Sequence, residues 1–354
     1  MSNLTGNQAL ARAAAIAGCG FFATHRALVT AALFDELDVA LRGRHGRCTR
    51  TAHAAEAATN AFEAAKAGAK VLVATAGLTL ASCGEAIGRA QLSEVPLVLV
   101  HCQHLGDADA PIVGDVDVGL ARHLAPGSVP LPVFAATDAA STFHLALRAF
   151  EIAGKLRTPV LLLTSKEIAM TAEAVDPGET NPPTWSNDPG DTAGFKKAFN
   201  APSQPFSPEP GAGDENERAL AGGEPARLRE KLARKADLPE LVAVDPDPDA
   251  QTLLAAYGVA DQAARRAVKL VRAAGGRVSH LTVYSLWPMP RQALRRALTP
   301  YVCRVLVPEL NAGLYADELS RLVKGVKIEP LARYDGRLIE PEAIARRITD
   351  WPCG

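Results

Sequence analysis

The chain has 354 residues, of which 48% are hydrophobic and 22% charged, a composition that favours a globular protein of two domains and excludes a fibrous or disordered chain. A formal net charge of -1 and an aromatic share of 5% argue against nucleic acid or an acidic membrane surface as a partner. The first residues lack the basic and apolar regions of a secretion signal, and the longest apolar runs are far shorter than a membrane span. We therefore expect a cytoplasmic protein without a membrane segment.

The first half of the chain alternates helices with apolar strands. Thr5 and Gln8 have the spacing of a capping box, so a helix should begin there and end at Gly18 or Gly20. The pattern further predicts strands at 21–23, 70–75, 96–101 and 160–164, and helices at 29–41, 52–66 and 137–155. A turn of small residues followed by a helix is expected at 76–92. Uniformly apolar strands that alternate with helices indicate a parallel sheet covered on both faces.

Prolines and glycines then interrupt the pattern from residue 172 to about 237, apart from a short basic helix expected at 227–235. The alternation returns with strands at 252–256, 278–283, 302–307 and 326–329, and helices at 260–274, 290–298 and 315–323. The sequence thus predicts an α/β domain over 1–171, a Pro/Gly-rich connector over 172–237, and a smaller α/β domain with its own parallel sheet over 238–354.

The six cysteines include no C-x-x-C pair, which excludes an ordinary iron–sulfur or structural zinc motif, and a cytoplasmic chain would keep them as thiols. The eight histidines have no carboxylate at ligand spacing, so we expect no metal on this chain. Any redox cluster would then belong to another chain.

Polar residues follow several of the predicted strands. The segment 101–104, His-Cys-Gln-His, comes directly after a buried strand, and ligands gather at the carboxyl ends of strands in open parallel sheets. The alternative is that these histidines only cap helices or satisfy loop hydrogen bonds. In the last domain, 284–290 also follows a strand, and there packing against the other domain or a partner is the favoured interpretation. The segment 309–313 follows the next strand, where Glu309 could be a charge at a helix N-terminus or a contact across an interface. No phosphate-binding glycine loop, zinc-protease motif, serine-hydrolase motif or G-D-G segment occurs.

Several short segments, in this order, resemble the alpha subunit of the 2-oxoacid:ferredoxin oxidoreductases, most closely the 2-oxoglutarate type. They are GNQALA at 6–11, AGAK at 67–70, ATAG at 74–77, EAIG at 85–88, EVPLVLV at 94–100, RTPV at 157–160, GDE at 213–215, SLWP at 285–288 and PELN at 308–311. No single segment is specific, but nine in the right order cover nearly the full length of the chain.

The resemblance implies one subunit of an enzyme that uses thiamine diphosphate. The implied fold is a pyrimidine-binding parallel-sheet domain followed by a smaller domain like the carboxyl-terminal domain of transketolases. A beta subunit would share the cofactor, supply its diphosphate and magnesium site, hold an iron–sulfur cluster and pass electrons to ferredoxin. The implied reaction is oxidative decarboxylation of a 2-oxoacid, with coenzyme A taking the acyl group. We expect a hetero-oligomer in which this chain alone is inactive.

The resemblance also implies where the cofactor and substrate would bind. Thr75 and Gly77 fall in the segment expected to contact the cofactor, although the family's next two residues, Pro and Gly, are replaced by Leu and Thr. His25, Arg26 and Gln103 fall in segments that face the substrate, and the family's threonine there is replaced by leucine at position 28.

Two catalytic positions depart from the family. The activating glutamate falls on Ala54, which leaves Glu56 as the candidate carboxylate, roughly 200° further around the helix. The substrate-binding arginine is replaced by His104, which could hold a carboxylate when protonated, less firmly than a bidentate arginine.

Three functions are consistent with this pattern. The first is an active alpha subunit with an altered pocket, and the second is a non-catalytic structural or regulatory paralogue in a multisubunit complex. A free-standing transferase of the transketolase type is disfavoured, because the chain lacks a diphosphate-binding motif. The sequence does not name the 2-oxoacid.

Overall fold

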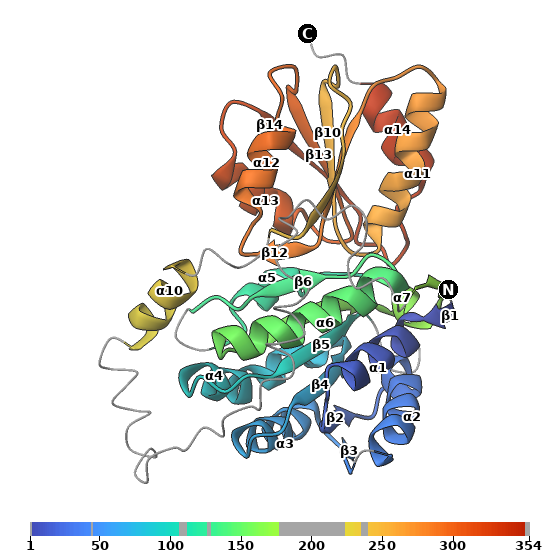
Figure 1. Cartoon of the computed structure of the whole chain (residues 1–354). Helices are drawn as coiled ribbons and strands as arrows, with labels where there is room; N and C mark the ends of the chain where they lie inside the picture. Colours follow the sequence, from blue (N-terminus) through green and yellow to red (C-terminus); the bar gives the residue numbers. More distant parts are fainter. Residues whose placement is uncertain are drawn as a thin grey trace.

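The apolar segments form the central strands of two β-sheets, each in its own α/β domain (Figure 1). The computed structural model describes residues 2–43, 45–105, 112–125, 129–176, 224–234 and 240–350. Most of the proline- and glycine-rich connector therefore lies outside the described residues, and its predicted boundaries stay predictions.

The first domain is built on a seven-stranded sheet in the order β12-β6-β7-β5-β4-β2-β3. Its strands are β2 (Phe21–His25), β3 (Arg47–Thr51), β4 (Val71–Ala76), β5 (Val98–Gln103), β6 (Val133–Ala135), β7 (Val160–Ser165) and β12 (Ser285–Trp287). Every neighbouring pair is parallel except β12 with β6. Strands β4, β5 and β7 are buried along their whole length, as expected for a parallel sheet between two helical layers.

Two layers of helices cover this sheet. Helices α1 (Gly6–Ile16), α2 (Leu28–Arg42) and α6 (Ala139–Leu156) pack on the face that buries Leu72 and Ala74 of β4. Helices α3 (Ala54–Lys66) and α4 (Gly84–Leu92) pack on the face that buries Val71 and Val73. Alternate residues of one strand therefore belong to two different hydrophobic clusters, because successive side chains of a strand point to opposite faces.

The local signals at helix ends are confirmed in part. Thr5 Oγ1 accepts from Gln8 N at 3.2 Å, and Gln8 Oε1 accepts from Thr5 N at 3.1 Å, so the capping box forms as predicted. The turn and helix predicted over 76–92 correspond to a 3₁₀ segment, η1 (Gly77–Cys83), followed by α4. Gly77 has φ +62°, outside the helical region, and this bend separates β4 from the helix.

Short strands at the sheet edges were not predicted. The edge strand β3 reads Arg-Cys-Thr-Arg-Thr, without the apolar run of the central strands. Strand β1 (Ser2–Thr5) pairs antiparallel with β8 (Ala172–Val175), which lies inside the range predicted as connector. These strands depend on a partner far away in the sequence, so local composition does not reveal them.

The second domain has a five-stranded sheet in the order β14-β13-β10-β11-β9. Its strands are β9 (Val242–Asp245), β10 (Thr252–Ala256), β11 (Ser279–Val283), β13 (Arg304–Glu309) and β14 (Lys327–Ala332). Its helices are α11 (Ala260–Ala273), α12 (Arg291–Ala297), α13 (Leu314–Leu322) and α14 (Pro341–Thr349). The sheet is parallel as predicted, except that β9 joins its edge antiparallel to β11.

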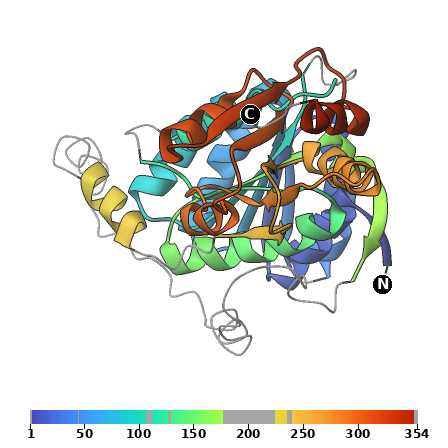
Figure 2. The same cartoon turned by 90° about the horizontal axis from the view of Figure 1, so that it is seen from above.

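Helix α10 (Glu224–Arg234) lies at the rim of the molecule, where it contacts α4 (Figure 2). Its Leu228 is buried, and its Arg227 and Lys231 both form ion pairs with Glu94. The basic helix predicted near the end of the connector therefore exists and is attached to the first domain. Among the described residues, no helix is long and apolar enough to cross a membrane.

The two domains share a strand and an aromatic cluster. Strand β12 leaves the second domain and extends the first sheet, with Trp287 paired to Val133 of β6. The Trp287 side chain is buried, and its ring packs edge-on against Tyr315 of α13 at a centroid distance of 6.1 Å. One hydrophobic cluster includes residues of both sheets. The segment 284–290 thus lies at the interdomain seam, one of the locations expected from the sequence.

Truncation of Trp287 tests this seam. Trp287→Ala should lower the free energy of unfolding by about 3–5 kcal/mol, because a large buried ring is lost from a packed interface. Urea denaturation followed by circular dichroism measures the change. Tyr301→Ala is the matched control, because Tyr301 belongs to the same domain and is 64% exposed. Equal losses in the two variants would contradict a seam that depends on Trp287.

Candidate functional site

Polar side chains gather where three neighbouring parallel strands end. His25 ends β2, Thr75 is next to last in β4, and His101 and Gln103 belong to β5. The chain leaves β2 for β3 on one side of the sheet, whereas β4 leads to β5 on the other side. The connections therefore diverge between β2 and β4, and open α/β sheets bind ligands at such a switch point.

A chain of polar contacts joins two of these strands to a loop beyond them. Thr75 Oγ1 lies 2.8 Å from His101 Nδ1, and His101 Nε2 forms an ion pair with Asp117. Gln103 Nε2 donates to Asp117 Oδ1 at 2.6 Å. Thr75 and His101 are fully buried. Two sequence-predicted residues, Thr75 and Gln103, thus belong to one polar network. In this network Asp117 contacts both His101 and Gln103.

Gly77 and His104, also predicted from the sequence, lie against each other. A Cβ atom at position 77 would stand 2.6 Å from Cε1 and 2.9 Å from Nε2 of His104. His104 Nδ1 lies 3.2 Å from the Leu105 carbonyl oxygen, which can only accept, so Nδ1 carries a proton. In the neutral ring, Nε2 is then a hydrogen-bond acceptor beside Gly77.

Burial favours the neutral form of His25 and of His104. Burial lowers the pKa of His25, and the charges of His101 and His104 lower it further. Burial is also the main cause that lowers the pKa of His104, whereas its hydrogen bond to the Leu105 carbonyl acts in the opposite direction. The lowered pKa favours the uncharged imidazole of His104 at neutral pH, so the cationic carboxylate contact considered from the sequence would require a lower pH. His25 Nδ1 is buried without a hydrogen-bond partner among the described residues.

Two sequence-predicted residues lie outside this network. Glu56 is exposed on the first turn of α3, whereas Ala54, where the family's glutamate would fall, is buried. No hydrogen bond or ion pair joins Glu56 to another described side chain. Arg26 is exposed immediately after β2. The structure therefore leaves both residues on the surface of this chain.

Sequence reasoning missed Asp117 and a second polar network beside it. Asn311 Nδ2 donates to Asp115 Oδ1 at 2.8 Å, which joins the loop before α5 (Val118–Arg122) to the second domain. Tyr257 donates from its hydroxyl to Glu309 Oε2 at 3.0 Å. No motif marks the two aspartates, because their partners lie on other strands and in the other domain.

Glu309 was considered from the sequence as a helix charge or an interface contact. It accepts hydrogen bonds from Tyr315 N at 2.8 Å and from Ala316 N at 2.9 Å, so it caps α13. Burial raises its pKa, although these hydrogen bonds act in the opposite direction. The segment 309–313 thus supports both the start of α13 and the polar contacts at the seam.

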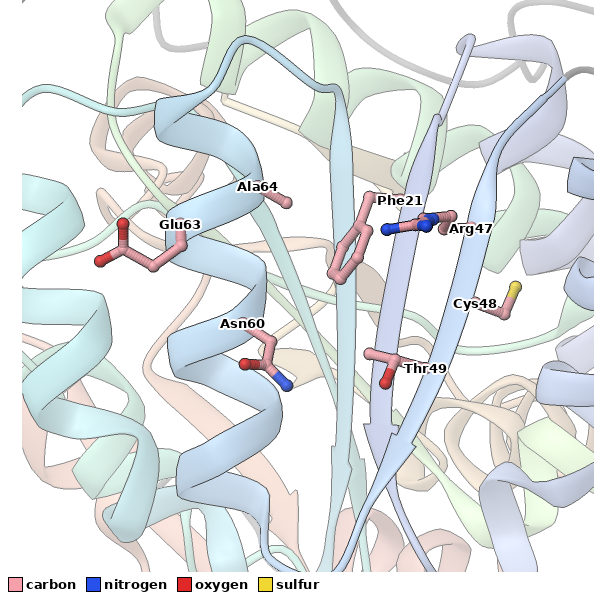
Figure 3. A pocket seen from close by; sticks show the side chains of 7 residues that line it. All are labelled: Phe21, Arg47, Cys48, Thr49, Asn60, Glu63 and Ala64. Atoms are coloured by element: carbon pink, nitrogen blue, oxygen red, sulfur yellow. The ribbon is translucent and has the colours of Figure 1, made fainter.

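A separate hollow lies between α3 and the strands β2 and β3 (Figure 3). It is lined by Phe21, Arg47, Cys48, Thr49, Asn60, Glu63 and Ala64. Phe21 and Arg47 are the first residues of their strands, so the hollow is at the end of the sheet opposite to His25. Burial raises the pKa of Cys48 to about 11, which keeps its sulfur as a thiol at neutral pH. We therefore place the candidate site at the carboxyl ends of the strands.

The described residues contain no group of three or more His, Cys, Asp or Glu side chains arranged to hold a metal ion.

Two family models match the chain. The thiamine-diphosphate-binding domain of pyruvate flavodoxin/ferredoxin oxidoreductases matches residues 46–213, and core domain II of pyruvate:ferredoxin oxidoreductase matches residues 250–344. The first match includes Thr75, Gly77, Gln103 and His104. The site at the strand ends therefore lies mainly in the part of the chain related to thiamine-diphosphate-binding domains.

Curated relatives align with nearly the whole chain. The 2-oxoglutarate synthase subunit KorA of Methanothermobacter marburgensis is 26% identical over 372 residues, which are 98% of this chain and 97% of the relative. The subunit of the same name from Archaeoglobus fulgidus is 28% identical and covers 97% of each chain. The ketoisovalerate oxidoreductase subunit VorB of Methanothermobacter thermautotrophicus is 28% identical over 86% of this chain and 85% of its own.

Solved structures show the same fold. A 2-oxoglutarate:ferredoxin oxidoreductase from Magnetococcus marinus, solved with 2-oxoglutarate, coenzyme A and succinyl-CoA, superposes with a TM-score of 0.79 at 20% identity. That match covers 99% of this chain but 65% of the longer solved chain. A split-gene transketolase, described as an inactive beta4 tetramer, gives a TM-score of 0.61 at 14% identity and covers 99% and 98% of the two chains.

The fold and the family matches define a thiamine-diphosphate-type α/β protein, as the sequence resemblance implied. The chain belongs to the 2-oxoacid:ferredoxin oxidoreductase family, where it corresponds to the alpha subunit.

The seam beside the site should respond to pH through Asp115. Burial raises the pKa of Asp115 to about 7, and the charges of Glu309 and Asp117 add to the shift, whereas the hydrogen bond from Asn311 opposes it. The folded state holds this proton more tightly than the unfolded chain, so the stabilisation is full below about pH 4 and is lost as pH rises towards 7.

Asp115→Asn removes this titration while keeping a hydrogen-bond acceptor for Asn311. We expect the variant to have a higher melting temperature than the parent chain at pH 8 and a much smaller advantage at pH 5, measured by differential scanning calorimetry. Asp335→Asn is the control, because Asp335 is fully exposed beside Arg333. A gain at pH 5 as large as that at pH 8 would contradict the titration of Asp115.

Proposed function

We propose that this chain is the alpha subunit of a 2-oxoacid:ferredoxin oxidoreductase that depends on thiamine diphosphate. A beta subunit supplies the diphosphate and magnesium site and the iron–sulfur cluster, and ferredoxin takes electrons through that subunit. The observation that supports the proposal most directly is the meeting of Thr75, Gly77 and His104 at the switch point of a domain that matches thiamine-diphosphate-binding domains.

The residues at the strand ends fit the pyrimidine end of the cofactor. The buried His25 Nδ1 lacks a partner among the described residues, and the absence of a side chain at Gly77 lets the His104 ring pack directly against the backbone there. Neutral imidazoles and an amide suit the amino group and ring nitrogens of an aminopyrimidine, since both sets of groups donate and accept. Thr75 and Gly77 would hold this end, and the bound cofactor supplies the centre that stabilises the carbanion after decarboxylation.

The substrate would meet His25, Gln103 and His104 in this proposal. Because burial lowers the pKa of His25 and of His104, both contribute hydrogen bonds rather than positive charge at neutral pH. Arg26 is the nearest residue of the substrate-facing segment with a permanent charge, and its exposed side chain is free to approach a ligand carboxylate.

The pyrimidine also requires a carboxylate in an active enzyme of this family. Glu56 is the candidate, because it is exposed on the first turn of α3, where a beta subunit that covers this face would bring the cofactor beside it. The buried Ala54 at the family's own glutamate position favours the second candidate function, a non-catalytic paralogue that keeps the fold and its assembly.

Reconstitution separates the two functions. We expect co-expression with a beta subunit to give a stable complex that reduces a viologen dye when supplied with a 2-oxoacid, coenzyme A, magnesium and thiamine diphosphate. The purified chain alone should be inactive and free of iron, because it has no clustered cysteines. Iron–sulfur absorbance in the homogeneous chain would contradict the assignment of the cluster to the partner. A stable complex that turns over no 2-oxoacid would favour the paralogue.

Glu56→Gln tests the proposed carboxylate in an active complex. Turnover should fall about a hundredfold or more while assembly is unchanged, because glutamine cannot share a proton with the pyrimidine as a carboxylate does. Steady-state kinetics and size-exclusion chromatography measure the two effects. Glu63→Gln is the control, since Glu63 lies two turns later on α3 and its side chain is 53% exposed. Unchanged turnover in Glu56→Gln would remove Glu56 from the mechanism.

A further inference from the structure

We propose that Asp117 is a positioning residue that fixes the imidazole of His101 and the side-chain amide of Gln103, and that the second domain holds Asp117 in place. The inference rests on the proposed function of the site at the strand ends. It gives the second domain a role in setting the geometry of that site, besides its contribution to stability.

Both oxygens of the Asp117 carboxylate are used within the first domain. Oδ2 forms the ion pair with His101 Nε2, and Oδ1 accepts from Gln103 Nε2 at 2.6 Å. The side chain is only 13% exposed, so water competes weakly for these contacts. Aspartate before a helix commonly accepts from the backbone N–H groups of the first turn, but Asp117 makes no such hydrogen bond to α5. Its carboxylate serves the strand ends instead.

These contacts fix how the two neighbours present their polar atoms. A carboxylate beside Nε2 of His101 favours a proton on that nitrogen, while Nδ1 lies 2.8 Å from the Thr75 hydroxyl oxygen. Because Gln103 donates to Asp117 through Nε2, its Oε1 is left to accept from an N–H or O–H group of a ligand. Without the carboxylate, the imidazole can change tautomer and the amide can rotate.

The second domain anchors the chain on both sides of Asp117. Two residues before it, Asp115 accepts from Asn311 of the second domain at 2.8 Å. Helix α5, directly after it, contacts α13 at the seam (Figure 1), where Arg122 forms an ion pair with Glu318. A Cβ atom at Gly119 would lie 3.5 Å from Leu314 Cδ1, which is ordinary contact distance. A helix of five residues has little stability of its own, so these contacts decide where Asp117 lies.

The test compares two Asp→Asn variants at the seam. Asp117→Asn keeps the shape of the side chain but removes the charge and places a donor near His101 or Gln103. Asp138→Asn is the matched control, because Asp138 forms an interdomain ion pair with Arg265 at 3.0 Å and asparagine still caps α6. Both are introduced into the full chain and, with the beta subunit, into the assembled complex.

Two readouts are measured for each variant. The first readout is turnover by the complex. We expect Asp117→Asn to lower kcat about tenfold or more, because the loss of one hydrogen bond to a charged group has an effect of this size. Asp138→Asn should change kcat less than twofold. The second is the tautomer of His101 in the full chain, read from the nitrogen chemical shifts of ¹⁵N-labelled histidine and assigned with His101→Gln. In the parent chain we expect the chemical shifts of a ring that carries its proton on Nε2. Asp117→Asn should change these shifts, and Asp138→Asn should preserve them.

The outcomes distinguish this inference from the proposed function. If Asp117→Asn lowers the melting temperature but leaves kcat and the His101 tautomer unchanged, Asp117 is structural and the inference is overturned. If the parent complex turns over no 2-oxoacid, the proposed function fails, and the tautomer readout alone decides whether Asp117 positions His101. A changed tautomer together with a lower kcat supports the positioning role.

Discussion

The pairing of β12 with β6 is the constraint on which the arrangement of this chain depends. The strand leaves the second domain and completes the sheet of the first, with Trp287 buried between β6 and Tyr315. Because the pairing fixes both the separation and the rotation of the two domains, contacts elsewhere along the seam can be short and specific. The link between Asp115 and Asn311 is one of them, and it is fully buried from water.

Several buried carboxylates at the seam are held by more than one partner. Asp261 illustrates the pattern, since its carboxylate accepts from His280 and Thr282 within the second domain and pairs with Arg265, which reaches Asp138 of the first. A carboxylate buried without such donors would cost several kcal/mol. The same rule explains why Glu309 is placed at the start of α13, where backbone N–H groups satisfy it.

The scaffold and the proposed chemistry follow different constraints in this chain. The buried strand β4 and the bend at Gly77 define the scaffold, whereas alanine and histidine occupy positions 54 and 104, where the sequence resemblance implied charged groups. A site made of neutral imidazoles, an amide and one shielded carboxylate recognises ligands through hydrogen bonds more than through charge. The family resemblance therefore indicates the reaction class more firmly than the substrate.

The sequence by itself determined the elements whose physics is local. The apolar runs at 252–256 and 160–164 predicted β10 and the centre of β7, and Thr5 with Gln8 predicted the start of α1, because periodicity and capping depend on neighbouring residues. It also named Thr75, Gly77 and His104, which the fold brings together. Only the tertiary structure decided that Asp117 joins His101 and Gln103, that β12 belongs to the first sheet, and that Glu56 stays on the surface. Those outcomes depend on partners distant in sequence, and no local pattern specifies which residues a folded chain brings into contact.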